Sequence, residues 1–398
     1  KGETVLRIED TDLERSTPEA VEAIIDGLDW LGLNFNEGPF YQTKRFDRYK
    51  EVIAEMLEAG TAYYCYCTQE ELQKMRDLAE ANKEKPRYNG MWRPEVGKTL
   101  PAIPEGVQPV VRFRNPETGV TSFDDLVHGT ITFQNTELDD LIIARPDGTP
   151  TYNFCVVIDD MDMGITHVVR GDDHINNTPR QINILKALNA PVPAYAHVAM
   201  ILGDDGQKLS KRHGAVSVTQ YRDEGYLPEA VLNYLIRLGW SHGDQEIFSW
   251  AEMIELFDLK DVNKAASAFN TSKLLWLNQH YMVQKDPAEL AALLVPYMQA
   301  IGIEITDMVY LEAAAKAHVA RCQTMVELAA MIQYLYVEEL TYDEESVEQH
   351  LTAVSKPTLI ALRDVFAGLD DWSSAPLKAA MKDLTKTLNI KMGEIGMP

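Results

Sequence analysis

The chain has little cysteine, no long hydrophobic run and a deficit of positive charge. Its four cysteines, Cys65, Cys67, Cys155 and Cys322, are scattered along 398 residues. No apolar stretch reaches the roughly 18 residues that a membrane-spanning helix requires, and no signal peptide opens the sequence. These absences argue against a disulfide framework and against membrane insertion, so we expect a protein of the reducing cytoplasm.

The charge balance is strongly acidic. The chain has 37 Lys and Arg residues against 61 Asp and Glu residues, a formal net charge of −24. Such a balance disfavours nucleic acid as a partner, because binding to a polyanion depends on Lys and Arg. A basic face can still coexist with acidic surfaces elsewhere, so RNA is not excluded. The length predicts two to four globular domains with ample core.

The most informative stretch is a short basic loop at residues 208–212, Lys-Leu-Ser-Lys-Arg. The apolar run from Val198 to Leu202 predicts a buried strand before it. Residues 204–206, Asp-Asp-Gly, predict a turn, because Asp tolerates the turn backbone and Gly supplies a positive φ. Lysine is a compact charge on a flexible stem, suited to a phosphate whose charge moves during a reaction. Taken alone, a run of cations more often marks an ordinary solvated loop.

Other motifs occur in order with this loop, and together they resemble a known family. The loop is similar to the second signature, the KMSKS-type loop, of class I aminoacyl-tRNA synthetases, in the variant typical of glutamyl-tRNA synthetases. The accompanying matches are Leu-Arg-Ile-Glu-Asp-Thr-Asp at 6–12, Thr-Tyr-Asn-Phe at 151–154, Arg-Gly-Asp-Asp-His at 170–174 and Trp-Ser-His-Gly-Asp at 240–244. The resemblance implies an α/β fold: a Rossmann-like catalytic domain with an inserted α+β domain, followed by an all-α region.

The resemblance and the pattern changes along the chain predict five segments. They are the first part of the catalytic domain at 1–67, an inserted connective domain that binds the tRNA acceptor end at 68–147, the second catalytic part with the lysine loop at 148–215, a stem-contact domain at 216–285 and a helical anticodon-binding domain at 286–398. Short strands that break the βα rhythm indicate the insertion, and helical periodicity indicates the last domain. The family's first signature, His-Ile-Gly-His or a variant, is absent, so we expect that an N-terminal segment and the distal C-terminus are missing.

Two local predictions concern secondary structure. Residues 16–19, Ser-Thr-Pro-Glu, have the spacing of a helix start. Val21, Ile24, Ile25, Leu28 and Leu31 follow at helical spacing and should face the sheet. Residues 156–160, Val-Val-Ile-Asp-Asp, predict a strand or buried segment whose acidic pair caps a turn.

Three residues are candidates for glutamate binding. Arg170 ends a strand-like run, where a charge is costly unless paired and a planar guanidinium suits a carboxylate. A structural salt bridge to Asp172 or Asp173 is the alternative. The resemblance implies that Arg170 binds the glutamate side chain and that Glu9 accepts the α-ammonium group, although Glu9 could be part of an ordinary polar loop. It also implies that Tyr152 lines the pocket, whereas a lone tyrosine is more often a packing residue.

The resemblance further implies an ATP site. Lys208 and Lys211 would be the catalytic lysines that close over the triphosphate after binding. Asp173 would lie near the ribose, and the backbone of Met200 and Ile201 would meet the adenine. Mg²⁺ is expected with ATP, held mainly by the phosphates and water, so we assign no metal ligand to the protein.

A zinc site is suggested and then opposed by the sequence. Cys65-Tyr66-Cys67 resembles the first half of a zinc site of some glutamyl-tRNA synthetases. The second half would need Cys or His about two dozen residues later, and residues 88–94 offer neither. Because tetrahedral zinc needs four ligands, we expect no bound zinc.

The implied reaction has two steps. ATP and L-glutamate form glutamyl-adenylate and pyrophosphate, and the glutamyl group then passes to the 3′ adenosine of tRNA(Glu). Three alternatives remain: a glutaminyl-tRNA synthetase, opposed by the helical C-terminal region; a tRNA-modifying glutamyl transferase, opposed by the length beyond residue 286; and a tRNA-binding fragment without catalysis, which the absent first signature permits. The resemblance also implies a monomer.

Overall fold

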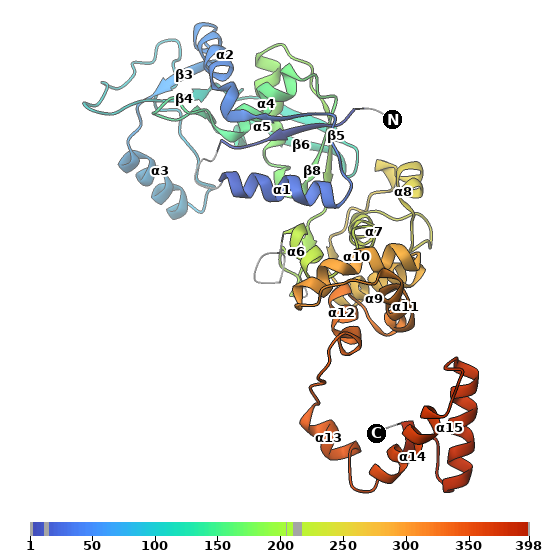
Figure 1. Cartoon of the computed structure of the whole chain (residues 1–398). Coiled ribbons are helices and arrows are strands. Elements are labelled where there is room, and N and C mark those ends of the chain that lie inside the picture. The colour runs from blue at the N-terminus through green and yellow to red at the C-terminus, as the bar shows by residue number, and fades with distance from the viewer. Residues whose placement is uncertain (1–2, 12–15, 204, 210–216, 397–398) are drawn as a thin grey trace. The chain divides into compact units, whose positions relative to one another are not determined.

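The computed structural model describes residues 3–11, 16–203, 205–209 and 217–396. The chain forms two compact units, the first ending at Met331 and the second beginning at Ile332 (Figure 1). Among the described residues, no helix has both the length and the apolar character needed to cross a bilayer.

Two strand–helix–strand units carry parallel strands in the first unit. They are β1 (Val5–Ile8), α1 (Pro18–Trp30) and β2 (Glu37–Tyr41), and β8 (His167–Gly171), α5 (Thr178–Ala187) and β9 (Ala194–Val198). β1 pairs with β2, and β8 pairs with β9. Parallel strands joined by a helix are the repeating element of Rossmann-like folds, and their carboxyl ends face the same edge. This arrangement positions the candidate site.

Helix α1 begins where the sequence predicts. Pro18 is its first residue, and the Thr17 hydroxyl accepts a hydrogen bond from the Ala20 N–H at 3.3 Å, satisfying a donor that the helix leaves free. The prediction that its apolar residues face the sheet is wrong for Ile24, which is 52% exposed. The buried residue of α1 is Gly27, where an added Cβ would lie 3.6 Å from Val218 of α6 (Val218–Asp223).

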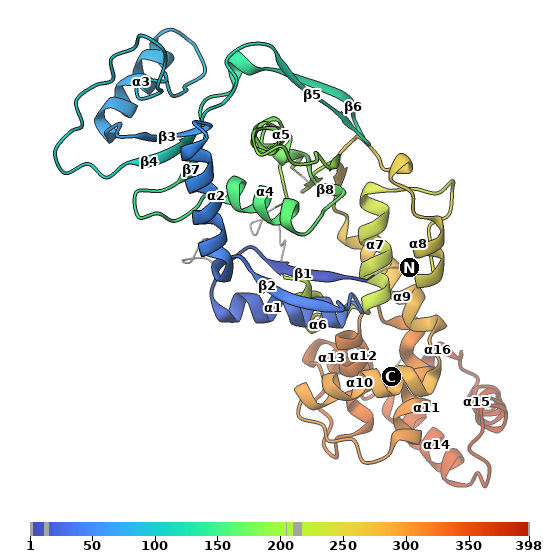
Figure 2. The same ribbon diagram turned by 90° about the horizontal axis from the view of Figure 1, so that it is seen from above.

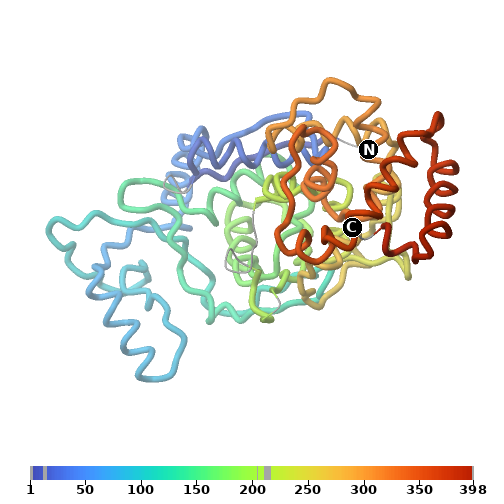
Figure 3. Tube along the Cα trace, turned by 60° about the horizontal axis from the view of Figure 1, so that its bottom comes forward, coloured from blue at the N-terminus to red at the C-terminus, as the bar shows by residue number. Residues whose placement is uncertain are grey.

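The predicted insertion contributes to two sheets. Its strands include β4 (Val110–Phe113), β5 (Val120–Asp125), β6 (Gly129–Gln134) and β7 (Ile142–Ala144), with β3 (Ala62–Cys65) and α3 (Gln69–Ala81) before them. β3, β4 and β7 form one antiparallel sheet, whereas the second sheet has the order β6-β5-β9-β8. The β5–β6 hairpin therefore extends the sheet of β8. Residues 82–109 contain neither helix nor strand and can be followed in Figure 3.

The largest core cluster surrounds helix α4 (Tyr152–Asp162). Figure 2 shows α4 between α2 (Phe46–Glu58) and α5. Phe154 and Ile158 of α4 are fully buried against Tyr49 of α2 and other apolar side chains. Full burial of such a side chain stabilises the fold by roughly 1.5–3 kcal/mol.

The prediction of a strand at 156–160 is therefore wrong, because these residues lie within α4. The prediction of a buried segment is confirmed, since residues 156–159 are buried. A short apolar run has the same pattern in a buried helix as in a buried strand, so periodicity cannot separate them.

The chain before the lysine loop is not one continuous strand, contrary to the prediction for 198–202. β9 ends at Val198, and a separate strand β10 (Ile201–Leu202) pairs in parallel with β11 (Ser267–Ala268). Leu202 also bridges to Lys208 across a turn in which Gly206 has a φ of +72°. The turn prediction is confirmed at Gly206, while Asp204 lies outside the described residues.

The rest of the first unit is helical. Its further helices are α7 (Pro228–Gly239), α8 (Trp250–Leu256), α9 (Thr271–Gln284), α10 (Pro287–Ala300), α11 (Met308–His318) and α12 (Met325–Ile332), the last of which runs one residue into the second unit. Asn278 of α9 is fully buried and receives a hydrogen bond from Leu227 N at 2.7 Å. Its amide donates to the carbonyl oxygens of Gly225 and Gln323 at 3.3 and 2.6 Å. One side chain thus joins α9 to the segments before α7 and α12.

The second unit is also helical. It contains α13 (Glu344–His350), α14 (Lys356–Ala367), α15 (Ser374–Leu388) and the short α16 (Gly393–Gly396), and no strand among its described residues. The all-α prediction for the C-terminal region is confirmed. Its buried apolar side chains among the described residues are Ile332, Leu384 and Ile395, so its core is small.

Candidate active site

A cavity of about 870 Å³ runs along β1 and β8 and reaches their carboxyl ends. Glu9 follows β1 directly, Arg170 is the penultimate residue of β8, and Tyr152 is the first residue of α4. All three line the cavity, together with residues of β1, β2, α4 and β8. Open α/β folds bind ligands at this edge. The structure therefore brings together the three residues that the sequence proposes for glutamate binding.

Arg170 is a cation with neutral partners. Its Nη2 donates to Thr178 Oγ1 at 2.7 Å and its Nε lies 3.3 Å from His197 Nε2, while the guanidinium is 5.5 Å from the Tyr195 ring centroid. Burial lowers the pKa of Arg170, and no carboxylate of the described residues forms an ion pair with it. The structural alternative, a salt bridge to Asp172 or Asp173, is wrong.

Glu9 is held by an arginine that sequence reasoning did not single out. Arg7 Nη2 lies 3.3 Å from Glu9 Oε1, and Arg7 Nη1 lies 2.9 Å from Asp160 Oδ1. Burial raises the pKa of Asp160, although Arg7 opposes that shift. The sequence does contain a signal for Arg7: it is the one charged residue in the otherwise apolar run 5–8. A charge in a buried strand requires a partner, so a nearby carboxylate could have been expected.

The neighbouring Asp159 has a structural role. It is fully buried and accepts hydrogen bonds from Gln42 Nε2 at 2.8 Å, Arg45 Nε at 2.7 Å and the Tyr49 hydroxyl at 2.9 Å. Burial and the nearby carboxylate raise the pKa of Tyr49 far above its ordinary range. Asp159 therefore fixes α4 to α2, and Asp160 pairs with Arg7, so the prediction that this acidic pair caps a turn is wrong.

Tyr152 is held at the wall of the cavity by the start of α4. Its ring centroid lies 6.0 Å from that of His174. Burial, with a contribution from the charge of Glu9, raises the pKa of Tyr152, so its hydroxyl stays protonated at neutral pH. The side chain can thus donate a hydrogen bond to a ligand without adding charge.

The residues proposed for ATP binding gather at the end of β8 and at the β10 hairpin. Lys208 Nζ lies 2.8 Å from Asp173 Oδ2, and this hydrogen bond lowers the pKa of Asp173. An added Cβ at Gly171 would lie 2.7 Å from Asp173 Oδ1 and 3.3 Å from Met200 Sδ, so these side chains converge there. The Ile201 carbonyl accepts from Leu209 N at 2.9 Å.

These ATP candidates do not line the large cavity. They form a second group beyond the end of β8, in which Asp173 lies three residues after Arg170. Lys211 lies outside the described residues.

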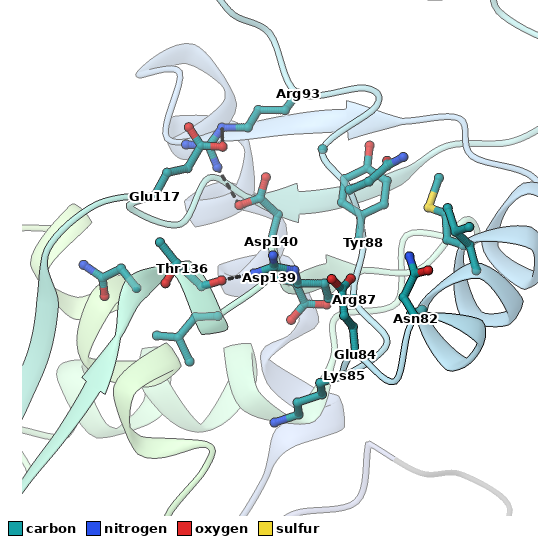
Figure 4. Close-up of a pocket in the computed structure, with 17 residues that line it drawn as sticks. Asn82, Glu84, Lys85, Arg87, Tyr88, Arg93, Glu117, Thr136, Asp139 and Asp140 are labelled. Carbon is teal, nitrogen blue, oxygen red and sulfur yellow. Dashed lines mark hydrogen bonds and ion pairs between the residues drawn. The ribbon is translucent and has the colours of Figure 1, made fainter.

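A second cavity, of about 470 Å³, lies in the predicted insertion (Figure 4). Its lining includes Arg93, whose Nη1 lies 2.7 Å from Asp140 Oδ1 and whose Nε lies 3.6 Å from Glu117 Oε1. The close-up also shows Arg87 bonded to the carbonyl of Thr136. Because Arg93 already has carboxylate partners, the cavity of Arg170 is the stronger candidate for binding an anion.

The cysteine pair just before the insertion, Cys65 and Cys67, does not fit a zinc site. Cys65 packs with Tyr63, Tyr88 and Trp92, and the pKa of Cys67 is raised to about 12 by burial and by neighbouring acidic groups. Zinc binds the thiolate, whereas this environment favours the thiol. Within the described part of the chain, no three His, Cys, Asp or Glu side chains are grouped as a metal site requires.

Comparison with known families agrees with this geometry. Residues 1–276 match the family described as tRNA synthetases class I (E and Q), catalytic domain, and residues 289–398 match the family described as anticodon binding domain. The chain belongs to the class I tRNA synthetases of the E and Q type. The predictions of the family, of the Rossmann-like catalytic fold and of a helical anticodon-binding region are confirmed.

Individual relatives are more specific. The chain is 58% identical to the glutamate–tRNA ligase of Dechloromonas aromatica and 58% identical to that of Azoarcus sp., over 100% of this chain and 85% of each relative. The corresponding ligase of Thiobacillus denitrificans is 57% identical over 100% of this chain and 84% of its own length.

Solved structures point the same way. A glutamate tRNA ligase from Elizabethkingia meningosepticum in complex with its amino acid superposes with a TM-score of 0.84 at 28% identity, and a glutamate-tRNA synthetase from Elizabethkingia anophelis with a TM-score of 0.82 at 28% identity. Each comparison covers 100% of this chain and 86% of the other.

Proposed function

We propose that this chain ligates L-glutamate to tRNA(Glu), with ATP as the energy source. The observation that carries the proposal is the pairing of charges at one cavity. Arg170 offers a cation without a contacting carboxylate, and Glu9, directly after β1, offers a carboxylate on the wall of the same cavity. An amino acid with an acidic side chain presents the opposite charges, an ammonium group for Glu9 and a side-chain carboxylate for Arg170.

The proposed reaction begins with activation of the amino acid. The α-carboxylate of glutamate attacks the α-phosphorus of ATP, an oxygen–phosphorus bond forms, and pyrophosphate leaves. Catalysis of such a step consists mainly of positioning and of stabilising charge on the phosphates. Glu9, Tyr152 and Arg170 supply the positioning, while Lys208 and Lys211 stabilise the triphosphate. Mg²⁺ enters with ATP as part of the substrate, held by phosphate oxygens and water.

The lysine loop has to change partners during this step. Lys208 is bonded to Asp173 in the structure, and Asp173 is itself proposed to meet the ribose. ATP binding would therefore release Lys208 toward the phosphates and free Asp173 for the sugar hydroxyls. Met200 and Ile201 would receive the adenine along their backbone. In the second step a hydroxyl of the tRNA 3′ adenosine attacks the glutamyl carbonyl, and AMP leaves.

The tRNA is proposed to contact three segments. Residues 68–147 would bind the acceptor end, residues 216–285 the stem, and residues 286–398 the anticodon. The match of 289–398 to an anticodon binding domain supports the last of these. We also propose that the protein works as a monomer in the cytoplasm.

Two alternatives share the scaffold. A glutaminyl-tRNA synthetase would need to bind a neutral carboxamide, which leaves the charge of Arg170 uncompensated, and it would carry a β-rich anticodon region where this chain is helical. A tRNA-modifying glutamyl transferase has no anticodon domain, which the match of residues 289–398 opposes.

The test is glutamate-dependent exchange of ATP and pyrophosphate, measured with and without tRNA(Glu). It is run on this chain and on the same chain preceded by a family segment that carries the first signature. Exchange that depends on glutamate in the extended chain supports the proposal, and exchange with glutamine alone would favour the glutaminyl enzyme. No exchange in either chain, with tRNA still bound, would leave a tRNA-binding module without catalysis.

A further inference from the structure

A buried acid–histidine pair lies directly behind Arg170. His197 of β9 is the register partner of Arg170 on β8, and Asp125 is the last residue of β5. Both side chains are fully buried, and His197 Nδ1 lies 2.6 Å from Asp125 Oδ2. The three strands bring together residues that are far apart in the chain, and neither Asp125 nor His197 has a role in the mechanism proposed above.

Asp125 is held as a charged acceptor. Its carboxylate accepts backbone N–H bonds from Val127 at 2.9 Å, from His128 at 2.8 Å and from His197 at 3.0 Å, in addition to the imidazole. Burial alone would raise the pKa of Asp125, but these hydrogen bonds outweigh it and lower the pKa. An ionised Asp125 requires the proton on His197 Nδ1.

The opposite nitrogen of His197 is then an acceptor that faces Arg170. Burial lowers the pKa of His197 although Asp125 opposes the shift, so the ring is neutral at neutral pH. Its Nε2 lies 2.9 Å from Thr178 Oγ1 and 3.3 Å from Arg170 Nε. The other charged or titratable groups near the ring are His128 and Tyr195, and the Tyr195 ring stacks on it at 6.1 Å.

These contacts fix the position of Arg170 without neutralising it. The Nη2 and Nε of its guanidinium bond to a hydroxyl and a neutral ring nitrogen. The charges of Asp160 and Glu9 act on Arg170, but neither carboxylate forms an ion pair with it. A carboxylate in direct contact with Arg170 would orient it equally well but would compete with an acidic ligand for its charge.

We propose that the Asp125–His197 pair, with Thr178, positions Arg170 as a cation without a contacting carboxylate and thereby sets the preference for a ligand carboxylate over a carboxamide. The inference rests on the proposed function, because it assigns the specificity of that same cavity. His197 and Asp125 are positioning residues that act through Arg170 and do not touch the substrate.

The test compares four variants of the extended chain in the exchange assay with tRNA(Glu). His197→Leu removes the ring nitrogen that accepts from Arg170, whereas His197→Gln keeps an acceptor oxygen at a similar distance from the backbone. Thr178→Val removes the hydroxyl that lies between Arg170 and His197. The matched control is Asn183→Leu in α5, which breaks buried hydrogen bonds to Asn115 and Thr121 of the same layer without contacting Arg170. Thermal unfolding is measured for each.

We expect His197→Leu to raise the KM for glutamate by about 10- to 100-fold, the loss typical of a hydrogen bond to a charged group. The KM for ATP should stay within about twofold, and the preference for glutamate over glutamine should fall by about tenfold. Thr178→Val should behave in the same way, His197→Gln should recover most of the loss, and Asn183→Leu should lower the melting temperature only.

Two results would overturn the inference. One is an unchanged glutamate preference in both His197→Leu and Thr178→Val. The other is a parallel rise of both KM values, matched by Asn183→Leu, which would mean that the pair serves stability alone. If the unsubstituted extended chain shows no glutamate-dependent exchange, the proposed function itself fails, and this inference fails with it.

Discussion

Arg170 occupies an environment that stability alone does not explain. A guanidinium taken out of water loses hydration, and two neutral hydrogen-bond partners return only part of it. Natural sequences tolerate such a local cost mainly where a ligand removes it. The burial of Arg170 without a carboxylate in contact is therefore the strongest single indication of the binding site.

The same reasoning predicts the effect of removing the cation. Arg170→Ala should weaken glutamate binding by about 100-fold or more, because a bidentate charged hydrogen bond is lost, while ATP binding changes little. Titration calorimetry with each ligand separately measures both effects. Arg145→Ala, in the exposed turn after β7, serves as the control and should leave both affinities unchanged. Equal losses for glutamate and ATP in Arg170→Ala would assign Arg170 a structural role.

At the residue scale, sequence reasoning found the groups that carry motifs and missed those that support them. Glu9, Tyr152 and Arg170 were predicted and line one cavity. Arg7, Asp125 and His197 were not, because their importance depends on strand pairings between distant segments, which no local pattern encodes. Lys211 stays a prediction from its motif.

At the scale of elements, helix starts were predictable and the identity of short apolar runs was not. Thr17 and Pro18 carry local capping chemistry, so the beginning of α1 could be located from the sequence. Residues 156–158 and 198–202 are short apolar runs. One became part of a helix and the other was divided between two strands, and tertiary contacts decided both outcomes. The roles of Asp159 and Asn278 depend likewise on contacts between elements.

Asn278 offers a test of such a contact. Asn278→Leu keeps the approximate volume but leaves the Leu227 N–H and the Gln323 carbonyl without their buried partner. We expect a loss of about 2–4 kcal/mol in the free energy of unfolding of the first unit. For a unit of this size this corresponds to a melting temperature lower by roughly 3–6 °C, measured by calorimetry.

The neighbouring residue gives a matched control for that substitution. Gln279 of the same helix makes one exposed hydrogen bond, to the Ala320 carbonyl at 3.0 Å. Gln279→Leu should therefore change the free energy of unfolding by less than about 1 kcal/mol. Similar losses in the two variants would show that the Asn278 hydrogen bonds do not join these helices.

At the scale of the whole molecule, the two units differ in how much core they possess. The first contains several buried clusters, among them the one around α4 and the one around Tyr234 and Leu274. The second has three buried apolar side chains among its described residues. Because burial of apolar area is the main source of stability, the second unit should open at a lower free energy than the first. This difference between the units depends on side-chain packing, which neither the length nor the composition of the chain reveals.

Limited proteolysis tests that inequality. Residues 337–343 are exposed, contain no helix, and include Glu338 and Glu339, so a protease specific for Glu should cut there before it cuts the helices and strands of the first unit. We expect a fragment ending near residue 339 to persist while the remainder is degraded, and Glu338→Gln with Glu339→Gln should slow its formation. The fragment should still bind glutamate in calorimetry, since the cavity is built from residues 5–170. Initial cuts within the helices or strands of the first unit, or simultaneous loss of both units, would show that the second unit is not the weaker part.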